Sequence, residues 1–301
     1  MFGPTPLLSV TIERKGPDGG DDVHMHSAGQ GVWVARMAAE LGAAPVLCGF
    51  AGGETGQVLR SLLERLPFES RLIETAAPSG AYVHDRRSGT RKPIAQSTTS
   101  PPSRHEVDDL FSVSCATAIE SDVLAVCGAY PGEALPLEVY GDLVADVRAN
   151  GTPVLVDLSP PRLDSALEGG PDVVKINDWE LAAFVYGPVD TPQRMRGAAE
   201  RLLEKGAGAA IVTRAAEPAL VLRGDRAWEL VPPRFERGSR EGCGDSMLGG
   251  LAAALAAGVE WEEAVRTAAA AGAANFLRHG LGSGARGVVD DLLPQVELNE
   301  L

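Results

Sequence analysis

The residues best suited to chemistry lie in one glycine-rich segment, Gly242-Cys243-Gly244-Asp245-Ser246-Met247. It runs into an Ala/Leu-rich stretch, 248–257, which has helix composition and ends at Gly258. The N-terminus of such a helix presents unpaired N–H groups and a positive dipole end, which suit an anion. A carboxylate at Asp245 would repel an anion that is only bound there. Abstraction of a proton beside a phosphate under transfer would explain why the carboxylate and the anion site occur together. A helix capped by Asp245 after a glycine turn is the alternative interpretation.

A second candidate site follows the short apolar run 173–176. In Asn177-Asp178-Trp179-Glu180, Asn177 and Glu180 are three residues apart and share a face if a helix begins there. An amide oxygen and a carboxylate at this spacing could hold a hydrated magnesium ion. An Asn cap followed by Glu three residues later is also a capping box, which is the alternative interpretation.

The elements that must position these residues alternate along the chain. Short apolar runs alternate with longer Ala/Leu/Glu/Arg-rich segments, a pattern typical of a parallel sheet covered by helices on both faces. Ligands in such folds collect beyond the carboxyl ends of the strands, where 177–180 would lie. The expected strands are 45–50, 123–127, 153–158, 173–176 and 209–213, and the expected helices are 32–41, 57–66, 136–149 and 191–205.

Two segments break this alternation, at about 8–28 and 80–96. Both alternate with a period of two and contain a turn, an Asp/Gly-rich one at 17–22 and Arg87-Ser88-Gly89-Thr90. We expect them to pair as a small projecting β-sheet that acts as a lid. Two decorative hairpins are the alternative.

Bulk composition narrows the class of protein. The chain has 301 residues, of which 45% are hydrophobic, enough for one large α/β domain or two smaller ones. A net charge of −14 without a basic run argues against binding to nucleic acid or to an anionic membrane. Four cysteines without paired spacing, and no secretory or membrane-spanning pattern, predict a cytoplasmic protein with free thiols.

Several common motifs are missing. Gly29-Gln30-Gly31 and Gly52-Gly53 do not form a dinucleotide fingerprint, and neither a Gly-x-x-x-x-Gly-Lys-Ser/Thr loop nor a Gly-x-Ser-x-Gly elbow occurs. A nucleotide would therefore be held in some other way. The four tryptophans are interpreted as packing residues rather than a stacking platform; they are Trp33, Trp179, Trp228 and Trp261.

Taken in order, these pieces resemble the PfkB/ribokinase family of small-molecule kinases, closest to its 1-phosphofructokinase and tagatose-6-phosphate kinase branch. The resemblance covers nearly the whole chain. It implies a single ribokinase-like domain over 1–301, a three-layer α/β/α sandwich with a mostly parallel central sheet and a small β-sheet lid. Its marks are Gly29-Gln30-Gly31 with Val34-Ala35-Arg36, Gly49-Phe50-Ala51-Gly52-Gly53 with Gly56, Gly128-Ala129-Tyr130-Pro131-Gly132, Asp157, Asn177 with Glu180, Gly242 to Ser246, and Gly280, Gly282 and Gly284.

The resemblance also implies an activity: ATP-dependent, Mg²⁺-assisted phosphoryl transfer to a hydroxyl of a sugar or sugar phosphate. Asp245 would be the general base, and backbone N–H groups of Gly242, Cys243 and Gly244 would stabilise charge on the transferring group. Asn177 and Glu180 would position magnesium through water. The lid would close over the sugar and exclude water, and similar proteins form homodimers through it.

Further contacts are implied by the same resemblance. Those to the acceptor are Ser9, Gly29, Gln30, Gly31, Trp33 and Tyr130. Those to the nucleotide are Lys175, Thr213, Arg214, Gly244, Asn275 and Gly282.

The chain departs from the family pattern on the acceptor side. Thr5-Pro6-Leu7-Leu8-Ser9 stands for Asn-Pro-Ala-x-Asp, Gln30 stands where a lysine is usual, and Ser79-Gly80 replaces a Thr-Arg pair. Two cations that could pair with a substrate phosphate are thus absent, each contact being worth ~1.5–3 kcal/mol. Replacements could come from the lid, at Arg86, Arg87, Arg91 or Lys92.

The nucleotide side departs as well, because Thr213-Arg214-Ala215-Ala216-Glu217-Pro218-Ala219 lacks both glycines of the usual Thr-x-Gly-x-x-Gly. These departures keep two alternatives open. One is a kinase of an unphosphorylated sugar or a nucleoside, with Trp33 and Tyr130 reshaping the pocket. The other is a non-catalytic or weakly active ligand-binding relative, which would have no need of Asp245 and Glu180.

Overall fold

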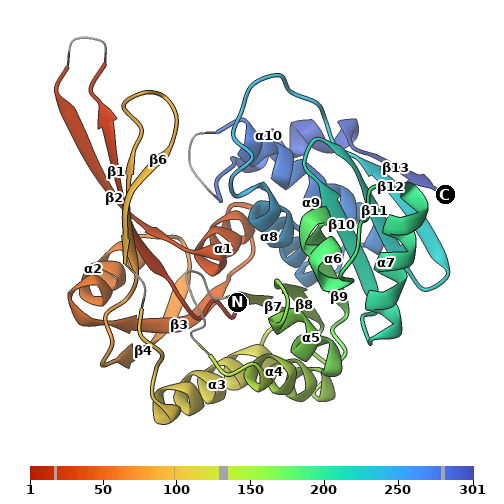
Figure 1. Ribbon diagram of the computed structural model, residues 1–301, viewed down its shortest axis with the longest axis horizontal. Coiled ribbons are helices and arrows are strands. Elements are labelled where there is room, and N and C mark those ends of the chain that lie inside the picture. The colour runs from red at the N-terminus through yellow and green to blue at the C-terminus, as the bar shows by residue number, and fades with distance from the viewer. Residues whose placement is uncertain (17–18, 98, 129–134, 279–281) are drawn as a thin grey trace.

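A central β-sheet forms the middle layer of the protein (Figure 1). The structure is a computed structural model that describes residues 1–16, 19–97, 99–128, 135–278 and 282–301. Seven strands lie in the order β13-β12-β11-β10-β9-β8-β7, and Phe2 bridges β7 to the pair β3-β4 through Val126 and Cys48. The strands are β3 (Val46–Gly52), β4 (Glu69–Thr75), β7 (Leu124–Cys127), β8 (Val154–Asp157), β9 (Val173–Asn177), β10 (Ala209–Arg214), β11 (Glu217–Arg223), β12 (Arg226–Val231) and β13 (Glu297–Glu300).

The direction of pairing changes once along this sheet. From β7 to β10 and between β3 and β4 all neighbours are parallel, whereas β10 to β13 form an antiparallel extension. The mostly parallel α/β sheet expected from the sequence is therefore confirmed. The antiparallel extension is an addition that the strand–helix alternation did not predict.

Successive side chains of the parallel strands enter two different hydrophobic cores, as the two-residue period of a strand requires. Val156 and Val174 lie in one core, and Leu155 and Val173 lie in the other. Helices cover both faces, which gives the predicted three layers (Figure 1). The first core packs under α3 (Arg104–Ile119), α4 (Glu138–Ala149), α5 (Arg162–Glu168), α6 (Asp178–Phe184) and α7 (Pro192–Glu204), and the second under α1 (Gln30–Glu40), α8 (Cys243–Ala256), α9 (Trp261–Phe276) and α10 (Arg286–Leu292).

Each expected strand and helix overlaps an observed element. The largest shift is at α2 (Gly53–Leu63), which begins at Gly53 instead of residue 57. A short 3-10 turn, η1 (Leu293–Gln295), leads into β13. No helix within the described ranges combines the length and the hydropathy needed to cross a membrane.

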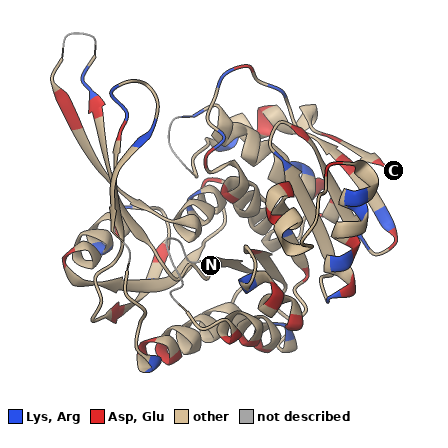
Figure 2. Ribbon diagram, viewed as in Figure 1, with Lys and Arg blue, Asp and Glu red and all other residues tan. Residues whose placement is uncertain are grey.

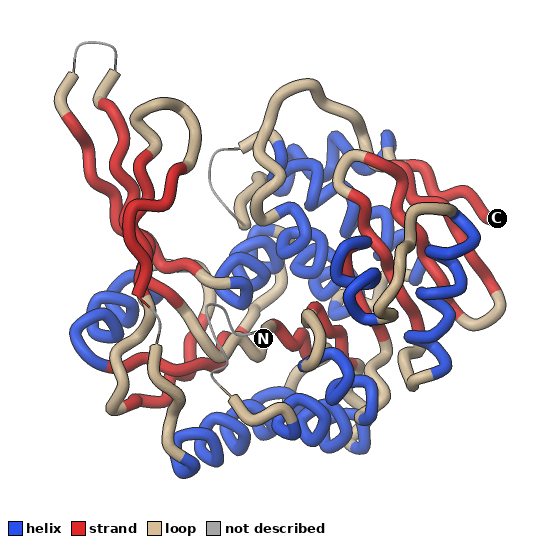
Figure 3. Tube along the Cα trace, viewed as in Figure 1, coloured by secondary structure: helices blue, strands red, loops and turns tan. Residues whose placement is uncertain are grey.

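A second, four-stranded sheet projects from this body (Figures 1 and 3). It has the order β2-β1-β5-β6, with β1 parallel to β5 and the outer pairs antiparallel. The projecting sheet expected from the period-two segments is therefore present. We call it the lid sheet; its strands are β1 (Leu7–Arg14), β2 (Asp21–Ala28), β5 (Ala81–Asp85) and β6 (Lys92–Ser97).

Strand register gives the lid sheet two chemically different faces. Residues opposite each other in register share a face, so Ser9 lies beside His26 and Tyr82. Ser9 and Tyr82 are buried, so this polar face turns toward the body. The opposite, outer face is apolar and includes exposed side chains; it carries Val10, Ile12, Val23, Met25 and Val83.

Figure 2 shows acidic and basic residues interspersed over the lid strands and the outer helices. The parallel strands β7 to β10 carry only three charged residues, Asp157, Lys175 and Arg214, at or near their carboxyl ends.

Candidate active site

The turn before α8 has the geometry of an anion site. Gly242 is the N-cap residue with φ 76° and ψ 0°, a left-handed conformation that favours glycine. No side chain caps this helix, and Asp245 is its third residue, so the alternative interpretation of Asp245 as the cap is wrong. The N–H of Cys243 donates to the Arg240 carbonyl oxygen at 3.3 Å, whereas the first-turn N–H of Gly244 has no acceptor within the helix.

Asp245 is a carboxylate with an unusual pKa. Burial, reinforced by the negative charge of Asp157, raises the pKa of Asp245 to about 7. The positive charge of Lys175 and a hydrogen bond from Gln30 oppose this rise. Because a general base works best when its pKa lies near the working pH, this carboxylate is suited to accept a proton at neutral pH.

A buried ion pair lies beside Asp245. Lys175 Nζ is 2.6 Å from Asp157 Oδ2, and the two side chains are 7% and 6% exposed. Burial alone would lower the pKa of Lys175, but Asp157 and Asp245 outweigh it and the pKa is raised. A Cβ atom at Gly244 would lie 2.6 Å from Nζ, so glycine is required there for the lysine to approach the helix end.

Gln30 connects the start of α1 to the same centre. Its Oε1 accepts a hydrogen bond from the N–H of Gly128 at 2.9 Å, and its Nε2 donates to the carbonyl oxygen of Asp157 at 3.3 Å. Gly29 is the N-cap residue of this helix and Gly31 is its second residue. The expected Gly-Gln-Gly segment thus lies at the candidate active site, with the amide of Gln30 already engaged by protein groups.

Asn177 and Glu180 form the capping box that the sequence offered as the alternative. The N–H of Glu180 donates to Asn177 Oδ1 at 2.9 Å, and Asn177 Nδ2 donates to Glu180 Oε2 at 2.6 Å. Burial, with Asp157 adding to it, raises the pKa of Glu180. The box uses Oε2 and leaves Oε1 out of these bonds, so capping and a metal-positioning role are compatible.

Three carboxylates face a single lysine in this centre: Asp157, Glu180 and Asp245 around Lys175. The surplus of negative charge and the oxygen donors suit a hard divalent cation such as Mg²⁺. In the described part of the chain no three such side chains converge into a ready ligand set. The residues therefore fit a magnesium ion that keeps water or substrate oxygens as most of its ligands.

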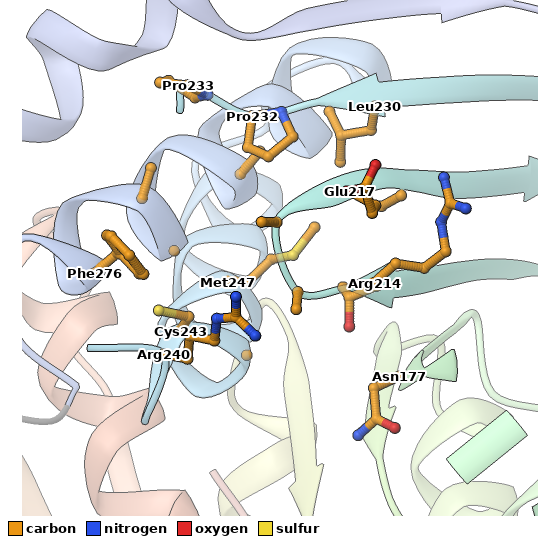
Figure 4. A pocket seen from close by; sticks show the side chains of 18 of the residues that line it. Asn177, Arg214, Glu217, Leu230, Pro232, Pro233, Arg240, Cys243, Met247 and Phe276 are labelled. Carbon is orange, nitrogen blue, oxygen red and sulfur yellow. The ribbon is translucent and has the colours of Figure 1, made fainter. Parts of the chain in front are cut away.

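A cavity of about 520 Å³ opens beside the first turn of α8 (Figure 4). Four of the residues expected to contact a nucleotide line it: Lys175, Thr213, Arg214 and Gly244. Leu230, Pro232 and Pro233 lie away from Arg240 and form an apolar surface suited to a flat ring (Figure 4). Phe235, Met247 and Phe276 add to the apolar lining.

Two expected nucleotide contacts do not line this cavity. Asn275 is fully buried; its Nδ2 donates to the Glu241 carbonyl oxygen at 2.8 Å, and its Oδ1 accepts from the Ser283 N–H at 3.1 Å. Gly282 packs against α1, where a Cβ would lie 2.4 Å from Trp33 Cα. Asn275 thus fixes the turn before α8 from behind, and Gly282 allows close packing on Trp33.

The β10–β11 turn has alanine at position 215, where the family pattern has glycine. Ala215 has φ 52°, a left-handed conformation that costs a residue with a Cβ roughly 1–2 kcal/mol. Arg214 Nε donates to the Pro218 carbonyl oxygen at 2.7 Å and holds the turn from inside. Arg214, Ala215 and Ala216 all line the cavity, so the missing glycines have not closed it.

On the acceptor side, Ser9 lies on the inner face of the lid sheet, and Trp33 packs against the cluster of Leu7, Ala28 and Tyr82 at its base. Tyr130 falls outside the described residues. The packing interpretation of the tryptophans is confirmed for Trp33 and for the buried Trp228 and Trp261. It is wrong for Trp179, which is exposed at the cavity rim.

Sequence patterns assign no role to two residues of this centre. Asp157 is only a mark of the family resemblance, although its place at the carboxyl end of β8, beside β9, is a usable signal. Arg240 lines the cavity, and Figure 4 shows it beside Cys243 and Met247. Its position two residues before Gly242 could have indicated it.

Residues 9–286 match the model of the pfkB family carbohydrate kinases. The chain belongs to this family. It is therefore a carbohydrate kinase, a phosphotransferase with an alcohol group as acceptor, as the sequence predicted. The resemblance to the phosphofructokinase branch is confirmed by the relatives.

The chain is 30% identical over 259 residues to the ATP-dependent 6-phosphofructokinase isozyme 2 of Escherichia coli K12, covering 84% of this chain and 82% of the relative. It is 29% identical over 254 residues to the 1-phosphofructokinase of Rhodobacter capsulatus, covering 81% and 78%. Among solved structures, phosphofructokinase-2 from Escherichia coli in complex with potassium superposes with a TM-score of 0.84 at 26% identity, covering 98% and 96%. The ribokinase-like fold is confirmed.

Proposed function

We propose that this protein uses ATP and Mg²⁺ to phosphorylate a hydroxyl of a sugar phosphate, with Asp245 as the general base. The observation that carries the proposal is the carboxylate of Asp245, with its pKa of about 7, in the first turn of α8. The same turn contributes Cys243 and Gly244 to the wall of the cavity. A group able to accept a proton thus lies next to a site for a phosphate chain.

In the proposed reaction, Asp245 takes the proton of the acceptor hydroxyl while that oxygen attacks the γ-phosphorus of ATP. The bond between the γ-phosphorus and the β–γ bridging oxygen breaks, and its electron pair leaves with ADP. The N–H groups at the start of α8 stabilise the negative charge on the transferring group. The inner face of the lid sheet excludes water, which limits hydrolysis of ATP.

The nucleotide would occupy the 520 Å³ cavity, with its phosphates at the end formed by Lys175, Gly244 and Arg240. Lys175 and Arg240 supply positive charge there, and the apolar end accepts the base. Asn177 and Glu180 would position magnesium, with Asp157 beside them; when bound, the ion would neutralise charge on the phosphates.

The names of the relatives favour a phosphorylated ketohexose as the acceptor, because they are 6-phosphofructokinases and 1-phosphofructokinases. The second candidate is an unphosphorylated sugar or a nucleoside. The observation that favours this second candidate is the glutamine at position 30, whose amide is held by Gly128 and Asp157, in the place where the family pattern has a lysine.

A coupled assay of ADP release tests both candidates with ATP and Mg²⁺ against fructose 6-phosphate, fructose 1-phosphate, tagatose 6-phosphate, ribose and adenosine. We expect turnover with one of the phosphorylated sugars, and its loss when the metal is chelated. No turnover with any of the five by a folded protein would contradict the proposal. Calorimetry that detects sugar binding without ATP–Mg²⁺ binding would then favour the non-catalytic relative.

We also propose that the apolar outer face of the lid sheet joins two copies of the chain. Val23 and Met25 are exposed there, and β2 and β6 are open sheet edges. Light scattering after size exclusion should give twice the chain mass of 31.4 kDa. Met25→Asp should halve this mass, whereas Ile119→Asp, at another exposed apolar position on α3, should not. A wild-type mass of one chain would rule the dimer out.

A further inference from the structure

A salt bridge connects the lid sheet to the turn before α8. Arg91, directly before β6, places Nη1 2.7 Å from Glu241 Oε2. The two residues are 150 positions apart in the chain, and their side chains are 20% and 52% exposed. The bridge therefore joins two segments that are far apart in the sequence, the lid sheet and the turn before α8.

Each partner of this bridge makes a further contact that fixes its position. The guanidinium of Arg91 lies over the ring of Tyr82, 5.2 Å from its centroid, on the inner face of the lid sheet. The carbonyl oxygen of Glu241 accepts a hydrogen bond from the fully buried Asn275. Glu241 is thus fixed between the lid sheet on one side and α9 on the other.

The position of Glu241 determines that of the anion site. The next residue is Gly242, the left-handed N-cap of α8, and Asp245 follows three residues later. A shift of Glu241 is therefore transmitted through one rotatable residue to the first N–H groups of the helix. Displacements of about 1 Å at such a site lower rates by around 10²-fold when they misalign the reacting groups.

We propose that Arg91 and Glu241 are positioning residues through which the lid sheet, once seated on the acceptor, holds the anion-binding turn of α8 in its productive geometry. This inference rests on the proposed function. Neither residue touches the reacting atoms; Arg91 acts on Glu241, and Glu241 acts on the turn.

Kinetics of single and double variants test the bridge. Arg91→Gln and Glu241→Gln should each lower kcat about five- to tenfold, with the KM for the acceptor changed less than about twofold. The double variant should be no slower than the slower single variant, because the two residues act as a unit. The exchanged pair Arg91→Glu with Glu241→Arg should recover part of the loss.

Arg71→Gln is the matched control. Arg71 also forms an arginine–glutamate ion pair of similar length, 2.9 Å to Glu69, but within β4 and outside the lid sheet. It should leave kcat within about twofold. If Glu241→Gln behaves as the wild type while Arg91→Gln raises only the acceptor KM, Arg91 contacts the substrate and the bridge is overturned. The bridge is also overturned if the losses of kcat in the two single variants multiply in the double variant.

Hydrogen exchange of the ligand-free chain tests the bridge without reference to activity. Amides of residues 239–242 should exchange faster in Arg91→Gln than in the wild type or in Arg71→Gln. Unchanged exchange would overturn the bridge even if the enzyme is active. Faster exchange in a chain that phosphorylates none of the tested acceptors would leave the bridge standing and count against the proposed function alone.

Discussion

Replacing Asp245 with asparagine should lower kcat by about 10²–10⁴-fold, the range that removal of a positioned general base produces. The amide has nearly the shape of the carboxylate, so the cavity and the turn before α8 should remain intact. ATP affinity measured by calorimetry should stay within about threefold of the wild type, because the lost interaction forms only as the proton moves.

The matched control for this variant is Glu236→Gln, which removes one negative charge from the rim of the same cavity. Its kcat should remain within about twofold of the wild type. Near-normal turnover of Asp245→Asn would refute the assignment of the base. A comparable loss in both variants would indicate that net charge at the cavity, and not proton transfer, determines the rate.

The pKa of Asp245 also predicts a pH dependence of kcat/KM that tests its assignment as the base. A carboxyl with a pKa of about 7 is protonated below pH 7, so kcat/KM should fall roughly tenfold per pH unit on the acid side and level off above pH 7. The acid limb should be absent from the residual activity of Asp245→Asn. A wild-type profile that is flat from pH 5.5 to 8 would contradict the assignment.

The raised pKa also has a stability consequence. The pKa of Asp245 rises from 3.8 in the unfolded chain to about 7 in the folded one, so the folded state holds this proton more tightly. The contribution to stability is fully present below pH 4 and is lost as the pH rises to 7. Asp245→Asn should therefore be more stable than the wild type at pH 8, a difference visible as a higher Tm.

Much of the fold followed from local patterns. The apolar runs that became β8 and β9, and the Ala-rich stretch that became α8, carry their own signals of period and punctuation. The pairing of β13 with β12 did not, because β13 begins 66 residues beyond the end of β12 and no local feature indicates that pairing. The turn at Ala215 escaped prediction for a related reason, since its left-handed conformation is imposed by the hairpin.

The residues of the candidate site also differ in whether the sequence predicts their role. The sequence indicates Asp245, Asn177 and Glu180 because each follows a predicted strand or begins a predicted helix. The family resemblance assigns Asn275 to the nucleotide, yet its amide is used between Glu241 and Ser283, which only the packing of α9 reveals. The Arg91–Glu241 bridge joins residues 150 positions apart, and no sequence pattern at either residue indicates it.

Lys175→Met should be strongly destabilising. It leaves the carboxylate of Asp157, 6% exposed, without its partner 2.6 Å away. Breaking one side of a buried pair costs about 3–5 kcal/mol of unfolding free energy. Two other carboxylates, Glu180 and Asp245, are close enough to repel the charge left behind. Chemical denaturation at pH 8 measures the loss.

The chain supplies its own control for this prediction. Lys205 and Asp164 form an ion pair of the same length, 2.6 Å, with side chains that are 55% and 40% exposed. Lys205→Met should cost no more than about 1 kcal/mol, because solvent screens that pair. The double variant Lys175→Met with Asp157→Asn should recover most of the lost stability, since no unpaired charge then remains at the pair.

Kinetics separate this role of Lys175 from simple support of the fold. The positive charge of Lys175 lowers the pKa of Asp245, so its removal should move the acid limb of the kcat/KM profile to a pH above 7. A residue that only filled space would leave that limb in place. If Lys175→Met is no less stable than Lys205→Met and its acid limb does not move, the buried pair does not tune the base, and the explanation of a neutral-pH carboxylate at the start of α8 fails.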